Sequence, residues 1–342
     1  MFTIPENGLL TFRKRAIKYK KEAQDDLNTC YYPGCLDKTI NSHILQKNGI
    51  LSKIAHDRHL RKLEINRFKT PHYEFKRKGI DKVFSFNGFC NFHDNDLFKD
   101  IETQEIDFGL YKTFLKFSIR ALYNEINRKE VIIKSYEKLL NDFPEYSNPQ
   151  ILEYIRQKKL GVSDLNNVGK RIWNDLNTGS ESYVFKYREL SQIDICSSGF
   201  YTYETTDEII AYVQKTQKEY SEFTNIFISF FPYQDKSILQ MGYPKYKEKE
   251  IKPYFNEIFK VSEKRVYRIL TNLLIFSENW VCSERFYDRY IKKDEHLFVG
   301  AYFFNRARTN ERLVYDLNFK DFNFVKKFKK WYTDHSHLID FH

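Results

Sequence analysis

Cys30, Cys35, Cys90 and His93 are the residues of this sequence whose types and spacing best suit a metal ion. They form a C-x4-C pair and, 54 residues further on, a C-x2-H pair. Thiolates and imidazoles in two close pairs are a ligand set typical of tetrahedral Zn²⁺. Four protein ligands close the coordination sphere, so we expect a structural Zn²⁺ that stabilises the fold and does not itself attack a substrate.

Tight turns must present both ligand pairs. Residues 31–34 (YYPG) separate the first two cysteines, and proline and glycine there favour the turn of a zinc knuckle. Asn87-Gly88 turns the chain into the second pair. Asp94 and Asn95 are suited to cap a helix that follows it. A knuckle, short strands and two ligands at a helix start together outline a treble-clef zinc finger.

A histidine lies between the two ligand pairs. Residues 36–42 are compatible with a short strand, which would deliver His43 at its end. A neutral imidazole, with a reference pKa of about 6.5, can accept a proton near neutral pH. His43 is therefore a candidate general base, although it can equally be a histidine that hydrogen-bonds within the finger and does no chemistry.

The order of these motifs resembles that of the HNH group of ββα-metal endonucleases over about residues 25–106. The residues that carry the resemblance are Cys30-x4-Cys35, Ser42-His43-Ile44 and Asn87-x2-Cys90-x2-His93-Asp94. It implies His43 as the general base, Asn87 as the residue that orients it, and Asp94 as a ligand of a second, hydrolytic Mg²⁺ or Mn²⁺. The family usually has an acidic residue before its histidine, where this chain has Ser42.

The resemblance implies a bacterial endonuclease of DNA or RNA, of a type that some uncharacterised proteins use in anti-phage defence. A second hypothesis stays open: a non-catalytic zinc-finger protein that binds nucleic acid or a protein partner. The serine at position 42 favours this second hypothesis, because a hydroxyl is a poor ligand for a hydrolytic metal. On that view Asp94 is a plain helix cap.

The gap between the ligand pairs is locally basic. Residues 53–82 hold ten Lys and Arg against four acids. Such a segment can face phosphate groups, and we take Lys76, Arg77 and Lys78 as the candidates for nucleic-acid contact. It can equally be a solvated flap.

Composition sets the broader expectations. The 342 residues are 42% hydrophobic, enough for buried cores, and 56 Lys and Arg against 46 acids give a net charge of +10 that favours polyanionic partners. The first ten residues lack the pattern of a secretory signal, and the apolar runs fall short of the roughly 20 residues of a membrane span. Cysteines at ligand spacing suit a reducing compartment, so we expect a cytoplasmic protein.

The elements predict an α+β chain with an HNH-like zinc module and its following helix in residues 1–145 and a mixed helix and antiparallel-sheet module in residues 146–342. A basic helix is expected over 11–28 and a long one over about 107–140, and Pro144 and Pro149 suggest the boundary. Behind it we expect strands at 182–188 and 199–203 and a hairpin of 225–231 with 237–242. The expected helices are about 248–260, 262–277, 284–305 and 323–332.

Overall fold

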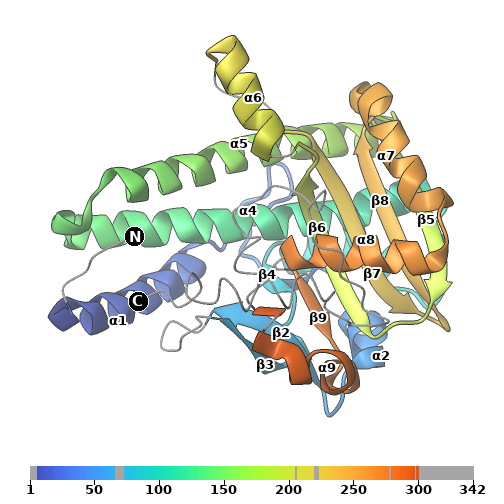
Figure 1. Cartoon of the computed structure of the whole chain (residues 1–342), viewed down its shortest axis with the longest axis horizontal. Coiled ribbons are helices and arrows are strands. Elements are labelled where there is room, and N and C mark those ends of the chain that lie inside the picture. Colours follow the sequence, from blue (N-terminus) through green and yellow to red (C-terminus); the bar gives the residue numbers. More distant parts are fainter. Residues whose placement is uncertain are drawn as a thin grey trace. The chain divides into compact units, whose positions relative to one another are not determined.

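The computed structural model describes residues 6–65, 73–204, 206–218, 223–276, 279–296 and 298–299 (Figure 1). These residues form helices and antiparallel sheets, which confirms the α+β class. The chain divides into two compact units made of alternating segments. Of the described residues, unit 1 comprises those within 1–44, 85–103 and 118–180, and unit 2 comprises those within 45–84, 104–117 and 181–299.

This division differs from the boundary that the two prolines suggested. Helix α4 (Tyr111–Asp142) ends before Pro144, and helix α5 (Pro149–Thr178) begins with Pro149. Both sides of the turn belong to unit 1. Proline ends one helix and starts the next in a helical hairpin just as it does in a linker, so the local signal does not distinguish the two.

Three helices support unit 1. Helix α1 (Glu6–Asp26) contacts α4, where the Tyr19 hydroxyl donates a hydrogen bond to the Asp142 carboxylate. Helix α5 contacts the other side of α4, where the Trp173 indole donates to the Tyr123 hydroxyl at 2.7 Å. Gly169 lets the two helices approach, because a Cβ at this position would lie 3.3 Å from atoms of Leu122 and Tyr123.

Unit 1 also contains a small strand pair followed by a helix. Strands β1 (Asn41–His43) and β4 (Ser85–Asn87) pair antiparallel, with Ser42 opposite Phe86. Helix α3 (Asn91–Phe98) follows, and Cys90 occupies its N-cap position in an extended conformation. The prediction that Asp94 or Asn95 caps this helix is therefore wrong. Asp94 instead lies in the first turn, where its backbone amide bonds the Cys90 carbonyl at 2.9 Å.

A seven-stranded antiparallel sheet forms the frame of unit 2. Its strands in spatial order are β3 (Tyr73–Gly79), β2 (His59–Ile65), β9 (Trp280–Cys282), β6 (Ile195–Thr202), β7 (Asn225–Tyr233), β8 (Lys236–Pro244) and β5 (Tyr183–Ser191). The predicted hairpin is confirmed as β7 and β8, joined by a tight turn at which Gln234 has φ 49°. The basic gap segment thus supplies two strands of this sheet.

Helices cover one face of the sheet. Helices α7 (Glu248–Lys260) and α8 (Glu263–Phe276) bury apolar side chains against Ile228, Phe230 and Met241 of β7 and β8 (Figure 1). The remaining described helices of unit 2 are α2 (Ser52–Ile54), which follows a π-helical turn at Lys47–Leu51, α6 (Thr206–Thr216) and α9 (Glu284–Tyr290). No described helix combines the length and the apolar character needed to cross a bilayer.

Several elements were not predicted. Helices α5 and α6 and strands β2, β3 and β9 carry no expectation from the sequence, whereas the expected strands and the helices near 248–260 and 262–277 are present. The start of the expected helix at 284–305 is found as α9, which ends at Tyr290, and a 3-10 helix follows at Lys292–Asp294, while residues 300–305 lie outside the described residues. The expected helix at 323–332 lies outside the described residues.

Candidate metal centre

The side chains of Cys30, Cys35, Cys90 and His93 converge in unit 1. Their four ligand atoms all lie within 4.8 Å of one another. The Nδ1 atom of His93 is 3.2 Å from the sulfur of Cys90 and 3.6 Å from that of Cys30, and the sulfurs of Cys35 and Cys90 are 4.0 Å apart. The sequence therefore identified a set of residues that the fold brings together across 54 intervening positions.

These separations fit a zinc ion. A Zn–S bond of about 2.3 Å and tetrahedral geometry place neighbouring ligand atoms about 3.8 Å apart. The observed separations of 3.2, 3.6 and 4.0 Å bracket that value. Three sulfurs and one imidazole nitrogen are also donors that zinc prefers over the hard oxygen ligands of Mg²⁺ or Ca²⁺. The group could hold Zn²⁺ with no fifth protein ligand.

Backbone hydrogen bonds help to place the ligand side chains. The Cys35 amide donates to the Tyr32 carbonyl at 3.0 Å, which closes the turn between the first two cysteines, and Gly34 adopts φ +79° there. The Cys30 sulfur accepts from the amides of Cys90 at 3.2 Å and Tyr32 at 3.5 Å. Amides aimed at a sulfur favour its thiolate form, which is the form that binds metal.

Burial opposes that thiolate in the absence of a cation. Cys30 and Cys90 are buried, with 6% and 4% of their surface exposed. Burial raises the pKa of Cys30 to about 11, although the amide hydrogen bonds from Cys90 and Tyr32 lower it in part. A divalent ion bound among the sulfurs would offset the cost of burying negative charge, because a coordinated thiol loses its proton outright.

Aromatic rings fix the imidazole ligand. The Tyr32 ring stacks on the His93 ring with centroids 3.8 Å apart and planes 6° from parallel. Trp173 of α5 meets the same Tyr32 ring edge-on at 5.2 Å. The knuckle turn and α5 therefore both restrict the rotation of His93, as outer contacts commonly do for metal-binding histidines.

His43 lies at the end of β1, directly opposite Ser85 of β4. Side chains of paired strands share a face at directly opposite positions and again two residues along. Since Asn41 is opposite Asn87, His43 and Asn87 lie on the same face of the strand pair as diagonal neighbours. Ser42 occupies the other face, where its hydroxyl accepts from the Phe89 amide at 3.1 Å, so this serine has a structural contact.

The side-chain amide of Asn87 donates to the carbonyl of Gln24 at 2.9 Å. That bond ties β4 to the end of α1. The side-chain nitrogen of Asn87 thus bonds α1 and not His43. The expectation that Asn87 orients His43 stays a prediction.

Asp94 contacts a cation from α4. Its Oδ2 lies 3.5 Å from Nη2 of Arg120, whose guanidinium is 1% exposed. Among the described residues, Cys30, Cys35, Cys90 and His93 are the one group of three or more His, Cys, Asp or Glu side chains close enough to share a metal ion. A second metal at Asp94 stays a prediction that these contacts do not support.

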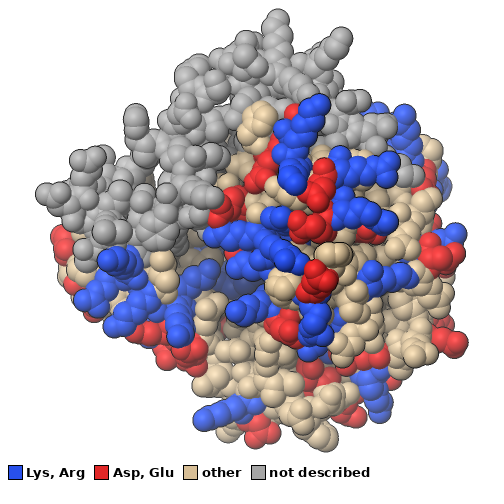
Figure 2. All heavy atoms as spheres, turned by 90° about the horizontal axis from the view of Figure 1, so that it is seen from below, with Lys and Arg blue, Asp and Glu red and all other residues tan. Residues whose placement is uncertain are grey.

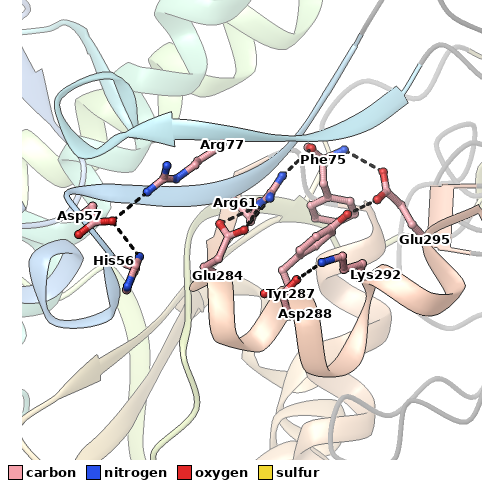
Figure 3. A network of polar contacts seen from close by, with 10 residues as sticks. All are labelled: His56, Asp57, Arg61, Phe75, Arg77, Glu284, Tyr287, Asp288, Lys292 and Glu295. Atoms are coloured by element: carbon pink, nitrogen blue, oxygen red, sulfur yellow. Dashed lines mark hydrogen bonds and ion pairs between the residues drawn. The ribbon is translucent and has the colours of Figure 1, made fainter.

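The three candidate contacts for nucleic acid do not form one patch. Lys76 and Lys78 lie on one face of β3 and Arg77 on the other, because side chains alternate along a strand. Each is close to an acid: Lys76 is 3.0 Å from Glu74, Lys78 is 2.7 Å from Glu64, and Arg77 is 3.4 Å from Asp57 (Figure 3).

The same pairing recurs around these strands. Arg61 of β2 forms a bidentate ion pair with Glu284 of α9, and its guanidinium lies over the Tyr287 ring at 4.5 Å (Figure 3). Figure 2 shows Lys and Arg gathered on one face with Asp and Glu side chains beside them. The acids paired with Lys76, Arg77 and Lys78 belong to the four already counted in residues 53–82, so these pairs do not change the local excess of positive charge, whereas Glu284 comes from outside that segment. Nucleic-acid contact by the three residues stays a prediction.

Sequence reasoning missed Arg120, which binds both Asp94 and Glu102. A signal was available, because Arg120 is a charged residue inside an apolar run of the long helix, between Ile119 and Ala121. A buried arginine is rare without paired acids.

The chain matches no protein-family model, no curated protein and no solved structure. The description of the metal centre therefore rests on the geometry of its own residues.

Proposed function

We propose that this chain is a zinc-stabilised, HNH-like endonuclease that hydrolyses phosphodiester bonds of DNA or RNA. The observation that supports it is the order of parts around the metal centre: knuckle, strand, strand and helix, with His43 at the end of the first strand. In this arrangement the zinc would hold a treble-clef finger together. The strand pair would present His43 and Asn87 on one face.

His43 is the residue proposed to do chemistry. Its neutral imidazole would accept a proton from a water molecule as that water attacks phosphorus. The bond from phosphorus to the leaving oxygen would break, and that oxygen would take a proton from solvent. Asp94 is the proposed ligand of Mg²⁺ or Mn²⁺, which supplies positive charge against the phosphate oxygens.

A cleavage assay with matched histidine variants tests this function. We expect the zinc-loaded protein to nick plasmid, single-stranded DNA or RNA in the presence of Mg²⁺ or Mn²⁺. The substitution His43→Ala should lower the rate about 10²- to 10⁴-fold, the range for loss of a general base, with the zinc content unchanged. His56→Ala is the control, because His56 is an exposed histidine of unit 2 that pairs with Asp57. Cleavage that survives His43→Ala would refute the mechanism.

The contact between Asp94 and Arg120 favours a second candidate function. A carboxylate already neutralised by a buried guanidinium is a weaker site for a divalent cation, and such a finger would act as a non-catalytic scaffold that binds nucleic acid or a protein. Salt-dependent binding of the same nucleic acids without any cleavage supports this candidate. If the chain neither binds nor cleaves these nucleic acids, a protein partner is indicated instead.

A further inference from the structure

Helix α4 carries a buried stripe of polar side chains. Arg120, Asn124 and Asn127 are 1%, 4% and 7% exposed. Their spacing of four and three residues places them on one face of the helix. Buried polar side chains at three successive turns are unusual, because each must find partners or raise the free energy of the fold.

Two residues of this stripe reach the segments that carry the zinc ligands. Arg120 donates through Nη2 to Glu102 at 2.5 Å and to Asp94 at 3.5 Å, and its guanidinium lies over the Phe98 ring at 4.0 Å. Asp94 is the residue after the ligand His93. Arg120 thus contacts α3 at its first turn (Asp94), at its last residue (Phe98) and just beyond its end (Glu102).

Asn127 makes the second connection. Its side-chain amide lies 3.5 Å from the Asn87 carbonyl at the end of β4 and 3.5 Å from the Tyr31 hydroxyl. Tyr31 follows the ligand Cys30, and its hydroxyl donates to Glu130 of the same helix at 2.7 Å. The stripe therefore contacts the knuckle, the second strand and the ligand helix.

Stability alone does not explain Arg120. Both of its ion pairs use Nη2, and its Nε and Nη1 are buried with no hydrogen-bond partner among the described residues. Removing a guanidinium from water with part of its donors unsatisfied is costly, and an apolar side chain of similar volume is often as stable or more so. A buried ionic group retained at such a cost is better explained by the geometry it imposes.

We infer that Arg120 is a positioning residue of the zinc centre. By holding Asp94 and Glu102 it fixes the rotation of α3, and α3 carries His93 in its first turn and Cys90 at its cap. A change in that rotation moves both ligands relative to Cys30 and Cys35. The inference depends on the zinc of the proposed function and not on His43 or on any cleavage.

Zinc release from variants of α4 tests this role. The purified full chain is mixed with a chromogenic chelator, and the rate of zinc transfer is measured beside the thermal unfolding temperature. Loss of a group bonded directly to a metal ligand typically weakens metal binding 10- to 100-fold. Arg120 acts one step further out, through Asp94 and Glu102, so Arg120→Met should release zinc about 3- to 10-fold faster. Arg120→Lys should behave similarly, because one ammonium group does not reproduce a planar fork that spans two carboxylates and stacks on Phe98.

Ile133→Ala is the matched control. Ile133 is a buried residue of α4 that packs with Ile151 and Ile155 of α5 and takes no part in the polar stripe. This variant should unfold at a lower temperature while its zinc release stays within about twofold of the wild type.

Release from Arg120→Met at the wild-type rate, or an equal acceleration by Ile133→Ala, would overturn the inference. If Arg120→Met does not fold, Glu102→Gln weakens the shorter ion pair with little change of shape. It should still speed release several-fold, and an unchanged rate again contradicts the role. A wild-type chain that binds no zinc would overturn the centre itself, whereas loss of cleavage alone leaves this inference standing.

Discussion

Asp94 has one observed contact, with Arg120, and one proposed role, as a ligand of a divalent cation. As a metal ligand it would need a carboxylate open to a divalent cation, whereas in this fold it faces the guanidinium of Arg120 at 3.5 Å. The contact is long compared with the 2.5 Å to Glu102, so Glu102 is the firmer partner. Arg120 could therefore keep its hold on α3 through Glu102 while Asp94 binds elsewhere.

Two other thiols offer a test at the same scale. Cys196 and Cys282 lie on the neighbouring strands β6 and β9 and are 0% exposed. Burial raises the pKa of both thiols well above the ordinary 9.0, and Asp194 adds to the rise at Cys196. Since the thiolate is the reactive form, we expect both cysteines to resist alkylation at pH 8 in the native protein and to react once guanidinium unfolds it.

The raised pKa values of Cys196 and Cys282 also predict that the free energy of unfolding falls at alkaline pH. A thiol whose pKa is higher in the folded than in the unfolded chain loses its stabilising contribution as the pH rises past the unfolded value. Peptide mapping by mass spectrometry across pH 8–11 should show labelling of Cys196 and Cys282 only where the sheet unfolds. Rapid labelling of either thiol at pH 8 in folded protein would contradict the burial described above.

At the scale of elements, the ends of α5 are defined by ordinary capping chemistry. The Asn148 side chain accepts from the Ile151 amide at 3.0 Å, Pro149 takes the first helical position, and Gly179 closes the helix with φ 73°. These three residues are the standard signature of a helix start and a helix end.

Substitution of the cap should weaken the whole of α5. Asn148→Ala removes the acceptor for the Ile151 backbone amide in the first turn, and such losses cost about 0.5–2 kcal/mol. We expect urea unfolding at pH 7 to show a free energy of unfolding that is lower by that amount. Asn148→Asp keeps an acceptor at the same position and should stay within a few tenths of a kcal/mol of the wild type, so equal losses in the two variants would exclude a capping effect.

The sequence could predict the features that local pattern encodes. The cluster of Cys30, Cys35, Cys90 and His93 was found because metal chemistry restricts residue types, and β7 and β8 were found because two largely apolar runs bracket a short polar turn. Strands β2 and β3 pair with each other locally but were missed because their many Lys and Arg residues suggested a phosphate-facing or solvated segment. The contact of β2 with β9, where Arg61 is opposite Cys282, spans more than two hundred positions and has no local signal. Pro144 and Pro149 were interpreted as a boundary between modules because proline follows or starts a helix in a helical hairpin just as it does in a linker.

At the scale of the molecule, the free energy of zinc binding is comparable to the whole free energy of unfolding of a domain. Structural zinc in finger peptides contributes about 10–16 kcal/mol near pH 7, while whole domains are stable by only 5–15 kcal/mol. Since all four ligands belong to unit 1, zinc binding and the folding of that unit should be coupled.

Metal removal should therefore affect the two units unequally. After chelation we expect faster hydrogen exchange in residues 28–44 and 85–103, which carry the ligands and their strands. Strands β7 and β8 should keep their protection, because their core with α7 and α8 contains no ligand. Exchange that rises equally in both regions would show that the units unfold together, and exchange that changes in neither would show that the finger is stable without metal.

The chain passes from one unit to the other after Ile44, Phe84, Thr103, Phe117 and Ser180. No single cut can release either unit intact. A fragment ending at Glu145 would contain β2 and β3 without the other strands of their sheet, and unpaired strand edges of this kind invite aggregation. Neither unit is one continuous stretch of chain, so we expect fragments to fold poorly, and neither unit can be moved into another protein by joining the chain at one position at each end.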